Sequence, residues 1–188
     1  MSNDLDYLFK PIVLVTGFGP FANHPVNASW EGVKLMNKDE IEKKHNIELV
    51  QIEIPSFTLE MQAHRKGYQR MDYLDKCPVN HICPVEGAIR LHTKLNVERI
   101  CKEFNECFDV EKMKAVSSKD AGRYLCEYIY YTSLSADNAR SLFVHVPDLT
   151  IYSAEETARG LEKVLDLCME QLFEIEDSKE VSEKLQNT

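Results

Sequence analysis

An apolar, β-branched run near the N-terminus constrains the fold of this chain most strongly. The stretch "IVLVTGF", from Ile12 to Phe18, is apolar at nearly every position, and Gly17 lies at its end. Such a run is typical of a strand buried on both faces, because a half-exposed strand alternates apolar and polar residues. Helices must then cover both sides of the sheet, so the run favours an α/β fold.

Helix-like and strand-like segments alternate after this run. We expect strands over 47–55, 114–118 and 141–147, and helices over 29–44, 96–108, 123–134 and from 153 onward. Ser153 and Glu156 have the spacing of a capping box at the start of the last helix. The stretch 61–96 lacks periodicity, and we expect an irregular excursion there. Together these segments predict one domain over 1–176 and a disordered tail over 177–188.

The expected fold class is α/β, with an open, mainly parallel sheet between two helical layers. In such a sheet, ligands bind beyond the carboxyl ends of the strands. This rule indicates three places for a site: the loop after Phe18, the segment after Ser118 and the turn after Val146.

Composition excludes several classes of function. The 188 residues carry a net charge of −9, which argues against nucleic acid and anionic membranes as partners. No apolar run approaches the ~20 residues of a membrane span, and the polar N-terminus does not have the order of a secretory signal. We therefore expect a cytosolic protein whose six cysteines are reduced thiols.

Cys77, His81 and Cys83 in "KCPVNHIC" raise the alternative of a metal or redox protein. Their spacing matches no common paired-ligand pattern, and a fourth ligand is not evident. We expect no metal and no cofactor.

Cys126 and His145 are the candidates for chemistry. Cys126 lies near the start of the predicted helix over 123–134, where periodicity by itself favours a packed thiol. The alternative is a thiolate, whose pKa a helix start and a nearby imidazole would lower. His145 interrupts the apolar strand "LFVHVP" and is the candidate base, although a single strand histidine is more often a satisfied core residue. Asp120 is expected near the cap of the Cys126 helix.

Three blocks of the chain resemble pyroglutamyl peptidase I, the C15 family of cysteine peptidases. They are "IVLVTGFGPFANHPVNASWEGVKLM", "SSKDAGRYLCEYIYYTSL" and "LFVHVPDL". The resemblance implies a phosphorylase/hydrolase-like α/β/α fold and removal of an N-terminal pyroglutamyl residue from peptides. It also implies a catalytic triad of Cys126, His145 and Glu60, the last from "TLE" followed by "KGY".

The first block of this resemblance implies a pocket for the flat lactam ring. Phe18 and Phe21 would cover the faces of the ring, and Asn27 would bond its polar edge or brace the loop. Taken singly, either phenylalanine is as readily explained as a core residue.

The chain departs from the family pattern after Ile54-Pro55. Family members have a helix, a central strand and a glycine-rich loop before "TLE", whereas here "SFTLE" follows almost directly. We therefore expect a sheet shortened by one central strand. Two functions follow as alternatives: an active peptidase, or an impaired paralogue or splice product that acts as a binding or regulatory protein. The sequence indicates neither the peptides cleaved nor an oligomeric state.

Overall fold

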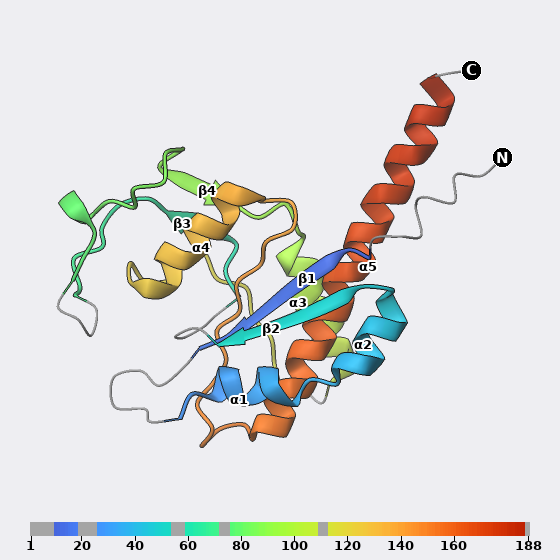
Figure 1. Ribbon diagram of the computed structural model, residues 1–188, viewed down its shortest axis with the longest axis horizontal. Helices are drawn as coiled ribbons and strands as arrows, with labels where there is room; N and C mark the ends of the chain where they lie inside the picture. The colour runs from blue at the N-terminus through green and yellow to red at the C-terminus, as the bar shows by residue number, and fades with distance from the viewer. Residues whose placement is uncertain (1–9, 19–25, 54–58, 72–75, 109–112, 187–188) are drawn as a thin grey trace.

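The computed structural model of the chain describes residues 10–18, 26–53, 59–71, 76–108 and 113–186. Figure 1 shows the order of the elements in these residues. They are β1 (Ile12–Gly17), α1 (Ala28–Leu35), α2 (Lys38–His45), β2 (Glu48–Glu53), β3 (Gln62–His64), the 3-10 turn η1 (Val79–His81), β4 (Arg90–His92), α3 (Val97–Cys107), α4 (Leu125–Ala136) and α5 (Ala154–Gln186).

β1 and β2 form a parallel pair, as the expected strands over 12–18 and 47–55 predict. The register runs from Ile12 opposite Glu48 to Gly17 opposite Glu53. Val13 and Val15 pack into a cluster with residues of α1 and α5, whereas Ile12 and Leu14 on the other face are 68% and 56% exposed. Helices therefore cover one face of β1, and the expectation of cover on both faces is wrong for this strand.

The predicted helix over 29–44 is two helices, α1 and α2. Asn37 starts the second helix, because its Oδ1 accepts a hydrogen bond from the Glu40 backbone N–H at 3.3 Å. Asn46, in the left-handed region at φ 51°, ends it. An asparagine cap inside a continuous helical pattern offers the backbone an alternative to the helix, and here that alternative is realised.

The segments 114–118 and 141–147 are extended but are not strands, so these two strand predictions are wrong. Within the described residues, Ser118 makes a parallel bridge to Glu60 and Phe143 makes an antiparallel bridge to the same residue. A strand needs a neighbour along its length to pair its backbone groups. Among the described residues, each of these two segments pairs with Glu60 through an isolated bridge and has no partner strand along its length.

The described residues of the stretch 61–96, which we expected to be irregular, form only the short elements β3, η1 and β4. β3 and β4 form a separate antiparallel pair, with Ala63 opposite Leu91, beside the parallel pair of β1 and β2 in the described chain. α4 packs on β3 and β4 at one end of the molecule, away from β1 and β2 (Figure 1).

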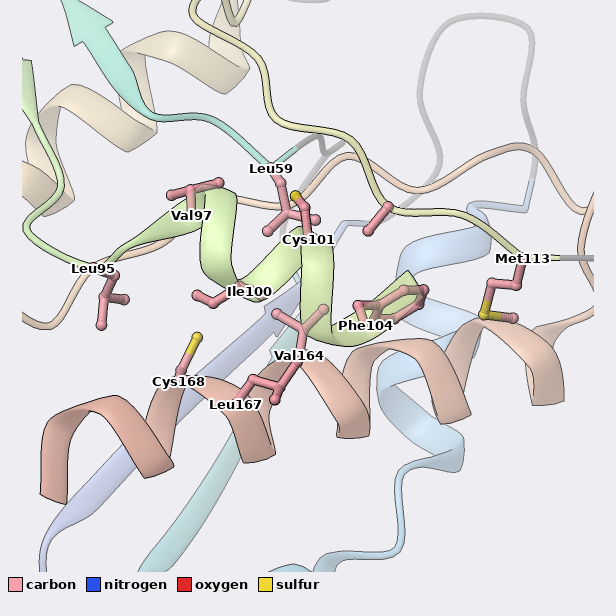
Figure 2. Packing of buried hydrophobic residues seen from close by; sticks show 11 residues of the cluster. Leu59, Leu95, Val97, Ile100, Cys101, Phe104, Met113, Val164, Leu167 and Cys168 are labelled. Atoms are coloured by element: carbon pink, nitrogen blue, oxygen red, sulfur yellow. The ribbon is translucent and has the colours of Figure 1, made fainter. Parts of the chain in front are cut away.

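α3 and α5 enclose the main apolar core. Figure 2 shows Phe104 and Ile100 of α3 facing Val164 and Leu167 of α5. The predicted capping box begins α5, since Ser153 and Glu156 exchange hydrogen bonds of 2.9 and 3.2 Å.

α5 extends to Gln186 and so reaches into the 177–188 segment, for which we expected a disordered tail. The segment is rich in Glu, Lys and Gln, which favour continuation of a helix. Among the described residues, no helix has both the length and the apolar character that crossing a membrane requires.

Candidate active site

Cys126 is the second residue of α4. The helix begins after Tyr124, whose side chain makes no capping hydrogen bond. Asp120 does not cap the helix, contrary to our expectation, because its Oδ1 accepts instead from the Gly122 N–H and from Arg123 Nη1. The side chains of Tyr124 and Asp120 therefore do not cap the first turn of α4.

The thiol of Cys126 is 6% exposed and belongs to an apolar cluster. Phe18, at the end of β1, and Phe143 belong to the same cluster. The rings of these two phenylalanines meet edge to face, with centroids 6.3 Å apart. Phe143 therefore joins the end of β1 to the start of α4.

His145 lies two residues after Phe143 in the extended segment. Its ring packs edge-on against the Phe143 ring, with centroids 5.4 Å apart. On one side it lines a cavity of about 180 Å³, whose other walls include Leu59, Val144 and Leu161. Burial among these apolar groups lowers the pKa of His145 to about 3.

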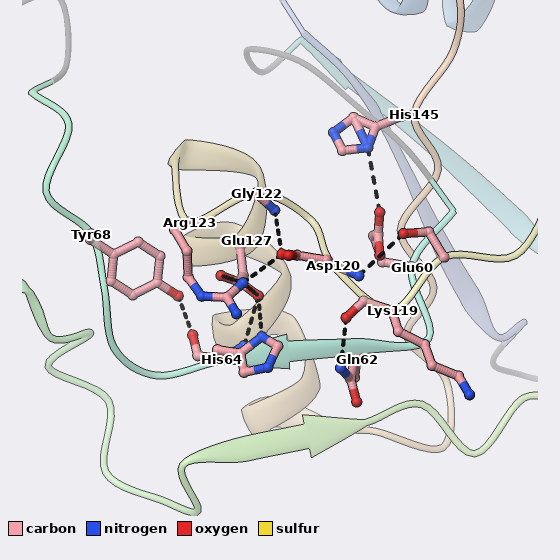
Figure 3. Close-up of polar contacts among 11 residues, drawn as sticks. Glu60, Gln62, His64, Tyr68, Lys119, Asp120, Gly122, Arg123, Glu127 and His145 are labelled. Carbon is pink, nitrogen blue, oxygen red and sulfur yellow. Dashed lines mark hydrogen bonds and ion pairs between the residues drawn. The ribbon is translucent and has the colours of Figure 1, made fainter.

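Glu60 joins the two extended segments. Its backbone N–H donates to the Phe143 carbonyl at 2.6 Å, and the next N–H, of Met61, donates to the Ser118 carbonyl at 2.9 Å. The carboxylate, 1% exposed, points toward the imidazole of His145 (Figure 3). Oε1 lies 3.7 Å from Nδ1, which is beyond hydrogen-bonding distance.

The Glu60 carboxyl is held in its neutral form at mildly acidic pH. Burial raises its pKa to about 7, and the negative charges of Asp120 and Glu127 add to this. Glu60 Oε2 and His145 Nδ1 have no hydrogen-bond partner among the described residues. A buried carboxyl and a partly buried imidazole thus face each other without a hydrogen bond between them.

Asn27 is the N-cap of α1. Its Oδ1 accepts from the N–H of Ser29 at 3.1 Å and from the Ser29 hydroxyl at 2.8 Å. The Ser29 Oγ in turn accepts from the Phe18 N–H at 2.9 Å. Through Ser29, Asn27 therefore holds the backbone at Phe18, directly after β1, in place. Phe18 itself is 1% exposed, whereas Phe21 lies outside the described residues.

The cysteines around His81 are arranged as follows. Cys77 Sγ lies 3.8 Å from His81 Nδ1, whereas Cys83 is fully buried and lies 4.0 Å from the Thr132 hydroxyl. In the part of the chain that the structure describes, no group of three or more His, Cys, Asp or Glu side chains is arranged to hold a metal.

A buried ionic network next to Cys126 was missed by sequence reasoning. Glu127 is fully buried and contacts Arg123 and His64. The i, i+4 spacing of Arg123 and Glu127 at the start of a helix was the available signal. Such pairs are usually solvated, and the partner from β3 is distant in sequence.

Comparison with known proteins identifies relatives along most of the chain. A family model described as pyroglutamyl peptidase matches residues 11–73. Human pyroglutamyl-peptidase 1 is 33% identical over 200 aligned positions, which cover 89% of this chain and 94% of the human protein. Because the alignment is longer than the 188 residues of this chain, the human protein has residues without a counterpart here.

Solved structures share the fold. The pyroglutamyl peptidase I of Bacillus amyloliquefaciens superposes with a TM-score of 0.64 at 19% identity, covering 85% of this chain and 97% of that one. A mutant pyrrolidone carboxyl peptidase from Pyrococcus furiosus gives a TM-score of 0.72 at 18% identity, covering 86% and 99%. These likenesses confirm the predicted α/β fold class.

Proposed function

Because this chain belongs to the pyroglutamyl peptidase family, peptidase family C15, we propose that it removes the N-terminal pyroglutamyl residue from peptides as a cysteine peptidase. The observation that carries the proposal is the placement of Glu60 against His145. These two groups lie beside the apolar cluster that contains Cys126.

Cys126 is the proposed nucleophile. Its thiolate attacks the carbonyl carbon of the pyroglutamyl residue, while His145 takes the thiol proton and then gives it to the leaving amine. A thioester forms as the peptide bond breaks, and water then hydrolyses the thioester to release free pyroglutamate. Backbone N–H groups in the first turn of α4 are the proposed donors to the oxyanion.

Glu60 is the proposed third member of the triad. Its position at Nδ1 of His145 leaves the other ring nitrogen for the thiol, and its negative charge stabilises the imidazolium that forms. To form this hydrogen bond, the 3.7 Å separation has to shorten by roughly 0.7 Å. In the free protein the pair is therefore close to the required geometry without having reached it.

The substrate pocket is proposed at the end of β1. Phe18 and Phe21 would supply its aromatic walls, and Asn27 would brace the loop through Ser29. An apolar pocket suits a neutral planar lactam, whereas the charged α-amine of free glutamate or glutamine would be left unpaired there.

A shortened homologue without catalytic activity is the less favoured alternative. The relatives are named as peptidases, and the three proposed catalytic residues are all present in this chain. We propose a cytosolic location, in keeping with six free cysteines, and no nucleic-acid partner, in keeping with the net charge of −9.

Hydrolysis of a fluorogenic pyroglutamyl amide by the purified chain tests the proposal. We expect turnover that Cys126→Ser abolishes, and no turnover of the matching glutamyl and glutaminyl amides. We also expect kcat/KM at least about tenfold below that of the human relative, because part of that protein has no counterpart here and Glu60 does not reach His145. No turnover at any enzyme concentration, or equal rates on the three amides, would overturn the proposal.

A further inference from the structure

The buried ionic network beside Cys126 takes no part in the proposed chemistry. Both carboxylate oxygens of Glu127 accept hydrogen bonds from Arg123 Nη1 at 2.9 Å. Oε1 also accepts from the His64 N–H at 3.0 Å and lies 2.6 Å from His64 Nδ1 (Figure 3). A buried carboxylate is unfavourable without such partners, and well-packed apolar residues would serve stability equally well.

The network joins the segment that carries Glu60 to the helix that carries Cys126. His64 belongs to β3, four residues after Glu60, whereas Glu127 directly follows Cys126 on α4. One end of this connection therefore directly follows Cys126 in the chain, and the other end lies four residues after Glu60.

Arg123 holds the loop before α4 in an unusual conformation. Its φ of 53° lies in the left-handed region, next to Gly122 at φ 90°. Its Nη1 also donates to Asp120 Oδ1 at 2.6 Å, and its aliphatic stem packs so closely on Gly67 that an added Cβ there would lie 3.2 Å from Arg123 Cδ. Non-glycine residues adopt this region at a cost, and these contacts compensate it.

These contacts hold the start of α4 where the side chain of the N-cap residue does not. The N-cap residue Tyr124 makes no capping hydrogen bond from its side chain. Glu127 connects the first turn of α4, which contains Cys126, to His64 of β3. Arg123 connects the same turn to Asp120 in the preceding loop. The charge of Glu127 also acts on Glu60, whose pKa it helps to raise after the larger effect of burial.

We propose that Arg123, Glu127 and His64 form a positioning unit that holds the Cys126 thiol in place relative to the Glu60 segment and compensates the buried charge beside it. The proposal rests on the proposed function, in which Cys126 is the nucleophile. Arg123 supplies a positive charge three residues before Cys126 in the chain, and Glu127 supplies a negative charge one residue after it. Removing the positive charge should therefore raise the pKa of the Cys126 thiol, and removing the negative charge should lower it.

Among the described residues, the ionisable groups in the apolar cluster of Cys126 are tyrosines and a second cysteine. The apolar cluster of Cys126 includes Tyr68 and Tyr130, whose pKa burial raises far above neutral, and Cys83 from the segment after η1. His145 packs on Phe143, which belongs to the same cluster, and Glu60 lies beside His145. Because the tyrosines stay neutral below pH 9, changes in the titration of Cys126 report mainly on the two charges that the variants remove.

The test is the pH dependence of Cys126 alkylation by iodoacetamide, measured by mass spectrometry of the Cys126 peptide. Glu127→Gln and Arg123→Gln are the test variants. Glu106→Gln removes an exposed carboxylate from α3, and Arg140→Gln removes an exposed arginine beyond the far end of α4, so these variants serve as matched controls. The assay needs no peptidase activity.

We expect the alkylation midpoint of Glu127→Gln to fall by about 0.5–1 pH unit and that of Arg123→Gln to rise by a similar amount. Both controls should keep the wild-type midpoint. If Arg123→Gln does not fold, Arg123→Lys, which keeps the charge but not the planar fork, should keep the midpoint while kcat falls. Shifts of the same sign in the two test variants, or shifts no larger than those of the controls, would overturn the proposal.

Peptidase kinetics give the second measurement. A positioning unit predicts that Glu127→Gln lowers kcat about tenfold or more with little change in KM, because it alters the nucleophile and not the pocket. A change in KM alone would contradict it. If wild-type protein cleaves no pyroglutamyl amide while the midpoints still shift in opposite directions, the proposed function fails and the network assignment stands.

Discussion

Nδ1 of His145 and Oε1 of Glu60 lie 3.7 Å apart, and a single backbone hydrogen bond from Glu60 to Phe143 sets this separation. The bond fixes the two segments in register, so that the Glu60 carboxyl faces the His145 imidazole. Burial then favours the neutral form of both groups, which raises the pKa of Glu60 and lowers that of His145.

These pKa shifts predict opposing effects of pH on stability. Folded Glu60, with a pKa of about 7, binds more protons than the unfolded chain between pH 4.5 and 7, so its contribution to stability is lost as the pH rises through that window. Folded His145, with a pKa of about 3, binds fewer protons than the unfolded chain, so its contribution is lost as the pH falls from 6.5 to 3.

Glu60→Gln should therefore steepen the rise of the unfolding free energy with pH between 4.5 and 6.5, because only the effect of His145 remains. Urea unfolding at a series of pH values measures this slope. Glu86→Gln, at an exposed position, is the control and should keep the wild-type slope. Equal slopes for Glu60→Gln and wild type would contradict the raised pKa of Glu60.

The same carboxylate should contribute to catalysis by less than a fully formed triad member does. We expect Glu60→Gln to lower kcat by about 10- to 100-fold, below the ~10⁴-fold of a hydrogen-bonded triad acid, because Glu60 and His145 are not bonded in the free protein. Steady-state kinetics on the pyroglutamyl amide measure the loss. A loss of less than twofold, similar to that of Glu86→Gln, would remove Glu60 from the triad.

Cys126 should be the most reactive thiol despite its burial. Cys107 is exposed, but it lies at the C-terminal end of α3, where the helix dipole disfavours a thiolate. At pH 6.5, limited iodoacetamide should modify Cys126 before Cys107. Peptide mapping by mass spectrometry gives the order, and faster labelling of Cys107 would show that Cys126 is a packed thiol.

Two helix glycines should respond oppositely to alanine. A Cβ on Gly160 of α5 would meet Met113 Sδ at 3.1 Å, and this flexible side chain can yield, so Gly160→Ala should raise stability by about 0.5–1 kcal/mol through helix propensity. A Cβ on Gly32 of α1 would lie 2.6 Å from Thr157 Cγ2, which is rigid, so Gly32→Ala should lower stability. Thermal unfolding of both variants measures the difference, and equal shifts in Tm would contradict the close packing of α1 on α5.

Helices and strands that depend on interactions between neighbouring residues in the chain were predictable from the sequence. β1 and β2 follow from apolar runs, α3 and α4 from helical periodicity, and the start of α5 from a capping box, because neighbouring residues in the chain supply these interactions. Cys126 and His145 stood out for a similar reason: each is unusual within its own segment. Their connection to Glu60 came only from the resemblance to a family.

Pairing between distant segments was decided by the tertiary structure. Whether 114–118 and 141–147 become strands depends on a neighbour along their length, and the described chain offers them isolated bridges to Glu60. The burial of Glu127 likewise depends on β3, more than sixty residues earlier in the chain. An amino-acid pattern records what a segment prefers, whereas pairing and burial depend on which distant segment arrives beside it, and only the folded chain brings that segment there.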